Sequence, residues 1–380
     1  MTKMMTAGLC YPDERHMKLD EIPVPEVADN EVLIRLRASG ISTGTLVNWR
    51  ILNRQPIWPT VIGIHGAGIV EEVGSTVFNH KPGDRVRVDP IVACGRCERC
   101  IADERLLCPD HFIIGFGATP LSSGIVQRVT PAFERYRQGV FAQYWRVPES
   151  AVETLPEQIS FDVGSKLAQL AVSHAAMRLA GSGRGKTILL TGATGGSGTA
   201  AIKVAPLFGV EKVIAIGRDQ GRLDDIAALE PGLVETVSTE SLDPDWETTE
   251  GLNRAIRAIT GGKGVDGLVD FMPDNLPVLR QAIYAMESGA TAVLAGGNTG
   301  KLDVDYIRAM PMNQYNLQGL RGHNLHDMLE VRKGLISGRM NVDELITQTF
   351  PLERVNDAID HLDSRTSSKS WLVTVHPNDA

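Results

Sequence analysis

The amino-acid sequence predicts an α/β protein in which a β-rich N-terminal domain is followed by a doubly wound parallel sheet. Residues 1–90 contain short runs of alternating apolar and polar residues, broken by Pro, Gly, Asn and Asp, which is typical of antiparallel strands. From residue 186 onward, short apolar runs alternate with helical patterns, which is typical of βαβ units. The 380 residues are enough for two or three domains.

In the β-rich part, strands are expected at residues 31–37, 68–74 and 85–88. Closely spaced short strands of this kind predict a barrel or a sandwich. A helical pattern follows at 161–180. Residues 115–139 have no clear period and are long for a connection, so a lid or binding loop and a solvated insertion are both open interpretations.

The parallel sheet is expected to start with a strand at 187–190, a glycine-rich turn, a helix at 199–208 and a strand at 212–216. In such a unit the glycines let the backbone approach a pyrophosphate, and the helix N-terminus offers free N–H groups. The spacing departs from strict G-x-G-x-x-G, and a turn without a ligand is the alternative. The turn residues expected to bind a dinucleotide are Thr191, Gly192, Thr194, Gly195, Gly196, Ser197 and Gly198.

Later segments complete the sheet and return to the first domain. The expected strands are 267–271, 291–294 and 371–375, and the expected helices are 276–286, 325–337 and 353–362. Gly296, just after one of these strands, is assigned to the dinucleotide site as well.

The residues after the second strand of the glycine-turn unit predict the choice of cofactor. An NAD site usually has an acidic side chain there for the ribose hydroxyls. Here Gly217 leaves room, and Arg218 and Arg222 offer guanidinium donors that suit a 2′-phosphate. The sequence therefore predicts NADP(H). Asp219 is the competing signal, because a shift of two residues would make it an NAD-type acid.

Four of the five cysteines lie close together in the sequence, as C-x2-C-x2-C-x7-C. They are Cys94, Cys97, Cys100 and Cys108. Four thiolates predict one closed, tetrahedral, structural zinc site per subunit, with no position left for water or substrate. An iron–sulfur cluster is the alternative. Cys10 lies apart and is interpreted as a small buried residue.

Charge and hydropathy exclude some classes of partner. The net charge is −8 and no basic stripe is present, which argues against nucleic-acid binding. No apolar run approaches the roughly 20 residues that span a bilayer, and the N-terminus lacks the pattern of a signal peptide. A cytoplasmic protein that acts on a small molecule and has no membrane partner is expected.

Short motifs spread over nearly the whole chain carry a family resemblance. They are PVP at 23–25, EVLI at 31–34, ASGI at 38–41, GAGIVEEVG at 66–74, PGDRV at 82–86 and FAQY at 141–144, with the four cysteines and the glycine turn. Together they resemble the medium-chain dehydrogenase/reductase superfamily, the zinc alcohol dehydrogenases and their zinc-free relatives. The resemblance implies a GroES-like catalytic domain at 1–161, a Rossmann domain at 162–318, a return to the catalytic domain at 319–380, and a homodimer or homotetramer.

The positions that hold catalytic zinc in this family are changed here. The family's cysteine is replaced by Ser42, and the Gly-His-Glu triplet is replaced by Gly63-Ile64-His65. The third ligand position falls on Gln169. His65 lies one position after the family's histidine. Shifting the alignment by one residue would make His65 a zinc ligand, but the other two ligands would still be missing. The resemblance therefore implies that the structural zinc is kept and the catalytic zinc is lost.

Without catalytic zinc, either hydrogen-bond donors polarise the substrate or the substrate is already electrophilic. The predicted function is an NADP(H)-dependent oxidoreductase that transfers hydride to an activated C=C or C=O. The alternatives are an alcohol dehydrogenase/carbonyl reductase with a side-chain proton donor and a non-catalytic NADPH-binding module. The candidate donors are Ser42, Thr43, Thr45 and His65, and Asn48, Trp49 and Trp58 are candidates for lining the substrate pocket.

Overall fold

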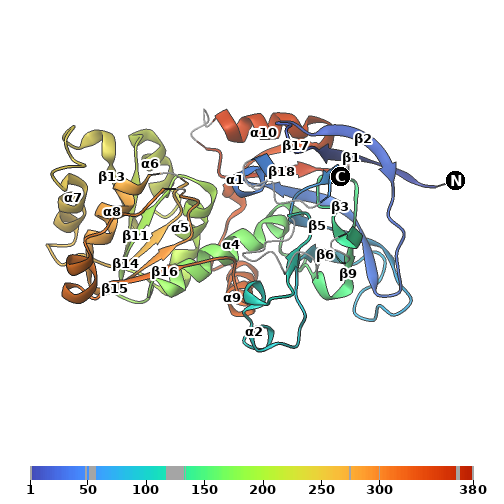
Figure 1. Ribbon diagram of the computed structural model, residues 1–380, viewed down its shortest axis with the longest axis horizontal. Helices are drawn as coiled ribbons and strands as arrows, with labels where there is room; N and C mark the ends of the chain where they lie inside the picture. The colour runs from blue at the N-terminus through green and yellow to red at the C-terminus, as the bar shows by residue number, and fades with distance from the viewer. Residues whose placement is uncertain are drawn as a thin grey trace. The chain divides into compact units, whose positions relative to one another are not determined.

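The structure is a computed structural model that describes residues 2–47, 49–50, 57–116, 132, 134–273, 275–298, 300–364 and 369–378. The chain forms two compact units (Figure 1). The first comprises Met1–Ala168 and Ile346–Ala380, and the second comprises Gln169–Leu345. No helix among the described residues combines the length and the apolar character needed to cross a membrane.

The first unit is built on short strands. They are β1 Met4–Cys10, β2 Lys18–Pro23, β3 Glu31–Ile41, β4 Thr60–Val61, β5 His65–Val73, β6 Arg85–Val88, β7 Ile91–Val92, β8 Phe112–Ile113, β9 Tyr144–Pro148, β10 Val152–Thr154, β17 Ile346–Pro351 and β18 Leu372–His376. Its main sheet follows the path β10-β6-β5-β3-β18-β17, and β9 also pairs with β3. A second sheet has the order β2-β1-β4, and β7 pairs with β8.

The core of this unit is organised around β3. This strand pairs with β5, β9 and β18, all antiparallel, so both of its edges are used. Ile34 of β3 packs in one apolar cluster with Phe141 and Trp145. The helices of this unit are α1 Thr43–Val47, α2 Glu98–Ile101, the first half of α4 Phe161–Leu179, and α10 Val355–Ser364, which packs against β17 and β18.

The second unit has one parallel sheet. Its strands are β11 Thr187–Thr191, β12 Lys212–Gly217, β13 Val234–Ser238, β14 Val265–Asp270, β15 Met286–Leu294 and β16 Asn316–Gly319. Its helices are α5 Gly196–Phe208, α6 Gln220–Ala227, α7 Gly251–Ile259, α8 Leu276–Tyr284 and α9 Leu325–Ile336, after the end of α4. The strand order is β13-β12-β11-β14-β15-β16, with every pair parallel.

This strand order is that of a doubly wound sheet, so the predicted fold class is confirmed. The order reverses between β11 and β14, and in such sheets ligands bind beyond the carboxyl ends of the strands at this switch point. The glycine turn follows β11 and therefore lies at that place.

The limits of the second unit differ from the expected 162–318. The unit begins within α4 and continues to Leu345. It extends beyond β16 because α9 is tied to the second half of α4. Asp327 of α9 accepts hydrogen bonds from His174 at 2.8 Å and from Arg178 at 2.9 Å. These contacts hold α9 in the second unit.

Candidate functional site

The glycine turn runs directly into α5, which begins at Gly196, three residues before the expected start. Gly195 is the N-cap and makes no side-chain cap hydrogen bond. The N–H groups of the first helical turn have no partner within the helix. Glycine has no side chain, so Gly195 cannot cap them. Free donors at a positive helix end are the feature that binds phosphate.

Two glycines of the turn have a steric reason to be glycine. Gly192 has φ +66°, and a Cβ there would lie 2.8 Å from the carbonyl carbon of Phe271. A Cβ on Gly198 would lie 2.5 Å from the Cα of Ala193. These glycines let the start of α5 and the segment after β14 approach the end of β11. Gly195 differs, because a Cβ there would have its nearest contact at 3.5 Å.

A buried carboxylate that the sequence did not reveal holds the turn in place. Asp270 ends β14, and it accepts hydrogen bonds from the Thr191 hydroxyl at 2.5 Å and the Asn298 amide at 3.2 Å. Burial raises the pKa of Asp270. Gly296 lies against this carboxylate, since a Cβ there would be 2.7 Å from Asp270 Oδ2. Asp270 thus links the ends of β11 and β14 to the segment after β15.

The end of β12 lies beside the glycine turn. A Cβ on Gly217 would be 3.4 Å from Thr194 Cγ2. Asp219, the competing NAD-type acid, is the N-cap of α6, and its carboxylate accepts the backbone N–H of Arg222 at 2.7 Å. Arg218 is exposed. The buried Nε of Arg222 has no hydrogen-bond partner among the described residues.

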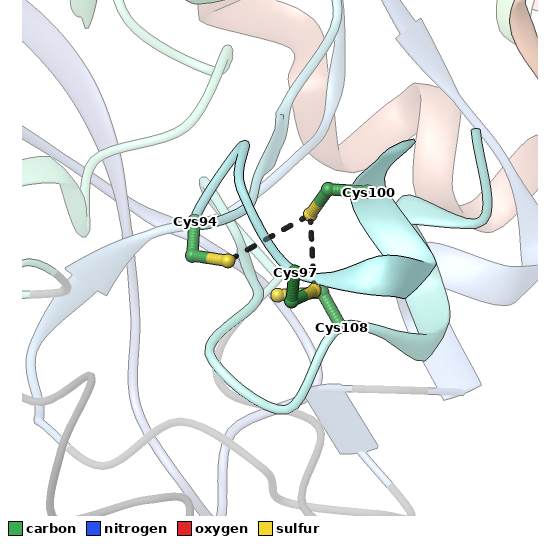
Figure 2. A group of neighbouring side chains, drawn as sticks. All are labelled: Cys94, Cys97, Cys100 and Cys108. Atoms are coloured by element: carbon green, nitrogen blue, oxygen red, sulfur yellow. Dashed lines mark hydrogen bonds between the residues drawn. The ribbon is translucent and has the colours of Figure 1, made fainter. Parts of the chain in front are cut away.

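The four cysteines of the predicted metal site come together in the first unit, with their sulfurs turned toward one another (Figure 2). All four Sγ atoms lie within 4.8 Å of one another, and Cys100 Sγ is 3.6 Å from Cys97 Sγ and 3.9 Å from Cys94 Sγ. Tetrahedral zinc with Zn–S bonds near 2.3 Å requires S···S separations of about 3.8 Å. The donor set and its spacing therefore fit structural zinc.

Few side chains are buried around these sulfurs: within residues 93–111 only Cys108 and His111 are buried, and Arg105 is paired with the buried Asp89. The short β7–β8 pair closes the base of the lobe, residues 93–111. Within this lobe, which the structure describes completely, Ile101 and Leu107 are exposed. The backbone N–H groups of Arg96 and Cys97 lower the pKa of the Cys94 thiol to about 6, whereas burial raises the pKa of Cys108 to about 12. A bound metal would stabilise the Cys108 thiolate, which burial alone disfavours.

The candidate donors of the first unit lie where β3 ends and β5 begins. Gly40 of β3 is opposite His65 of β5. Ser42 accepts the backbone N–H of Thr45 at 3.3 Å, and the two hydroxyls are 3.1 Å apart. Thr45 is buried, Thr43 is exposed, and Ser42 and His65 are partly buried. The Ser42 hydroxyl therefore has a local structural role at the start of α1.

A buried lysine next to these residues was missed in the sequence. Lys166 of α4 is 1% exposed, and its Nζ donates to the Ile41 carbonyl oxygen at 2.7 Å. Burial lowers its pKa to about 7, and Asp162, one helical turn earlier, opposes this. A signal was present: Val163 and Leu170 lie three residues before and four residues after Lys166, which places the lysine on an apolar helix face.

The remaining candidates have other positions. Gln169, at the expected third zinc-ligand position, donates from Nε2 to Ser197 Oγ at 3.4 Å, at the first turn of α5. Trp49 is a core residue rather than a pocket residue, since it is fully buried and its Nε1 donates to the Tyr11 carbonyl oxygen. Trp58 is partly buried. Asn48 and most of the 115–139 segment lie outside the described residues.

Comparisons with known proteins agree with this architecture. Residues 28–157 match the family model "Alcohol dehydrogenase GroES-like domain", and residues 196–334 match "Zinc-binding dehydrogenase". Sorbitol dehydrogenase of Bacillus subtilis is 30% identical over 374 residues, which are 96% of this chain and 95% of that protein. The chain belongs to the medium-chain dehydrogenase/reductase superfamily.

Other members of the superfamily extend the comparison. D-xylulose reductase A of Aspergillus niger is 27% identical over 370 residues, 94% of each chain. A crystal structure of an NAD-dependent alcohol dehydrogenase has a TM-score of 0.81 and 26% identity, covering 98% of this chain and all of that one. The relatives are dehydrogenases and reductases, so an oxidoreductase is supported, as are zinc and a nicotinamide cofactor in general terms.

Proposed function

We propose that this protein is an NADP(H)-dependent oxidoreductase that reduces an activated C=C or C=O of a small molecule without catalytic zinc. The observation that carries the proposal is the identity of the residues at the positions of the family's three zinc ligands. Ser42, Ile64 and Gln169 stand where zinc-dependent members have ligands, and a hydroxyl, an alkyl group and an amide do not form a catalytic zinc site.

The preference for NADP(H) is supported by the end of β12. The Asp219 carboxylate caps α6 through Oδ1, so one of its two oxygens is used by the helix start rather than by a ribose. Arg218 is exposed, and the buried Nε of Arg222 has no partner among the described residues. A 2′-phosphate would accept hydrogen bonds from such guanidinium groups. When bound, the reduced nicotinamide supplies a hydride.

Replacing Arg218 with Ala tests this preference. We expect Kd for NADPH to rise roughly 10- to 100-fold, since a hydrogen bond to a charged group contributes about 1.5–3 kcal/mol. Kd for NADH should change little. Fluorescence titration with both nucleotides measures this, and Arg339→Ala, an exposed arginine on another segment, controls for net charge. Equal losses for the two nucleotides would remove the assignment.

Metal analysis combined with NADPH turnover tests the reaction itself. We expect about one zinc per chain, as a single closed site implies. We also expect NADPH oxidation with enones, quinones or reactive carbonyls. Two zinc ions per chain would show that the catalytic positions are misaligned. NADPH binding without turnover over a broad panel would favour a non-catalytic binding module.

A second candidate is an alcohol dehydrogenase or carbonyl reductase in which a side chain replaces the metal. The names of the relatives favour it, because sorbitol dehydrogenase and D-xylulose reductase are named for an alcohol and a ketose. Faster turnover of ketones than of enones would select this candidate. In either case we propose a homodimer or homotetramer in the cytoplasm, which sedimentation and cell fractionation would test.

A further inference from the structure

A buried cation lies in the same cluster as Ser42 and His65. A Cβ on Gly40 would be 2.8 Å from Lys166 Cε and 3.0 Å from His65 Cβ, so the bare glycine makes room for both side chains. The lysine side chain passes over Gly40 and ends at the carbonyl oxygen of Ile41, the residue before Ser42. Three elements, β3, β5 and α4, therefore converge next to Ser42, which stands at a zinc-ligand position of zinc-dependent members.

Burial of this lysine is unfavourable for the fold by itself. An ammonium group has three donors, and the described residues provide Nζ with one acceptor, the Ile41 carbonyl oxygen. A buried charge with so few partners destabilises the folded chain, whereas an apolar side chain of similar length would not. A role as a clamp on Ile41 does not require a charge. The charge lies beside the candidate donors, and this position points to a role in the reaction rather than in folding.

We propose that Lys166 is a positioning cation, whose ammonium group provides the positive potential at the Ser42–His65 cluster that catalytic zinc provides in zinc-dependent relatives. The inference rests on the proposed function. In the reduction of a carbonyl, the substrate carbon gains the hydride of the reduced nicotinamide, and the C=O π electrons move to the oxygen. The oxygen then takes a proton from solvent, and the nicotinamide ring remains in its oxidised form. Lys166 stabilises the negative charge on the oxygen without contacting it.

The charge on Lys166 depends on pH in the neutral range. The groups around it are Asp162 on its own helix, His376 on β18, which binds the Asp162 carboxylate at 2.8 Å, and His65 on β5. Below pH 7 the amine is protonated, and the charge is lost as pH rises through its pKa of about 7. The rate of reduction should therefore be highest below this pH and fall above it.

The variant Lys166→Met tests the proposal. We expect kcat to fall roughly tenfold, less than the roughly 100-fold or more that follows removal of a donor in direct contact with an oxyanion, because Lys166 acts at a distance. The fall in rate between pH 6 and 9 should disappear, with Kd for NADPH unchanged. The matched control is Lys203→Met, which removes another buried lysine, one paired with Glu230 and Glu344 in the second unit. It should keep the wild-type kcat and pH profile.

Two measurements do not depend on turnover. In protein labelled with ¹³Cε-lysine, the resonance missing from Lys166→Met should titrate near pH 7. Benzoate, used as an oxyanion probe, should bind at least tenfold more weakly to the variant than to the wild type at pH 6. A normal lysine titration or equal benzoate affinities would overturn the proposal. So would a wild-type pH profile in the variant.

These results separate the proposal from the proposed function. If the wild type oxidises no NADPH with any acceptor, the proposed function fails, and the resonance and benzoate measurements still decide the role of Lys166. If Lys166→Met does not fold, Lys166→Gln replaces it. The wild-type data then also decide, because kcat must fall at the pH at which the Lys166 resonance titrates.

Discussion

We expect Gly198→Ala to weaken NADPH binding tenfold or more while the chain still folds. The added methyl group would lie 2.5 Å from both the Ala193 Cα and the Gly192 carbonyl oxygen, which are backbone atoms that cannot move aside. Overpacking of this kind costs about 1–3 kcal/mol. The start of α5 must shift away from the end of β11, so its N–H groups lose their alignment with the phosphates, and each 1.4 kcal/mol lost is about a tenfold change in Kd.

Gly195→Ala is the matched control for this substitution. It adds the same methyl group to the same turn, but the nearest atom would be at 3.5 Å, an ordinary contact. We expect Gly195→Ala to fold as stably as the wild type and to lose much less affinity than Gly198→Ala. Equilibrium titration with NADPH and thermal unfolding measure both effects. If the two variants lost the same affinity, the steric account of the turn would be wrong.

We expect Cys97→Ser to lose its zinc and to open the 93–111 lobe. Closed structural zinc sites contribute directly to folding. Here the exposed Ile101 and Leu107 provide no apolar core that could replace the metal. Metal analysis should fall from about one zinc per chain to almost none, and proteolysis should begin within the lobe. The melting temperature should fall by roughly 2–4 °C for each kcal/mol lost.

The control for the cysteine prediction is Cys10→Ala. Cys10 is buried in the first strand and is not one of the four clustered sulfurs, so this variant should keep its zinc and an intact lobe. Unchanged zinc content together with unchanged melting in Cys97→Ser would contradict the assignment of the site.

The parallel sheet could be predicted from the sequence because its strands are buried on both faces. The runs at 187–190 and 212–216 are apolar throughout, apart from Thr187 and Lys212 at their starts, and each lies next to a glycine break. β13 and β17 were not predicted. Val234–Ser238 and Ile346–Pro351 are mostly polar or partly exposed strands, and only their neighbours in the sheet make them strands.

Local patterns also identified the cysteine lobe and the glycine turn, because all of their essential residues lie within a few positions of one another. The carboxylate of Asp270 and the amine of Lys166 could not be found in this way. Each acquires its importance from residues far away in the sequence: Thr191 and Asn298 for Asp270, and Ile41 for Lys166. Such pairings depend on the topology of the sheet and on helix packing, which local spacing does not encode.

The interrupted first unit has a consequence for biosynthesis. β18 pairs with β3 at Ser39–Ile41, on the edge opposite β5, so this edge of the central strand lacks its partner until β18 has been synthesised. The parallel-sheet unit is synthesised completely before that. We therefore expect nascent chains to acquire nucleotide affinity early, whereas the first unit closes only after β18 has been synthesised.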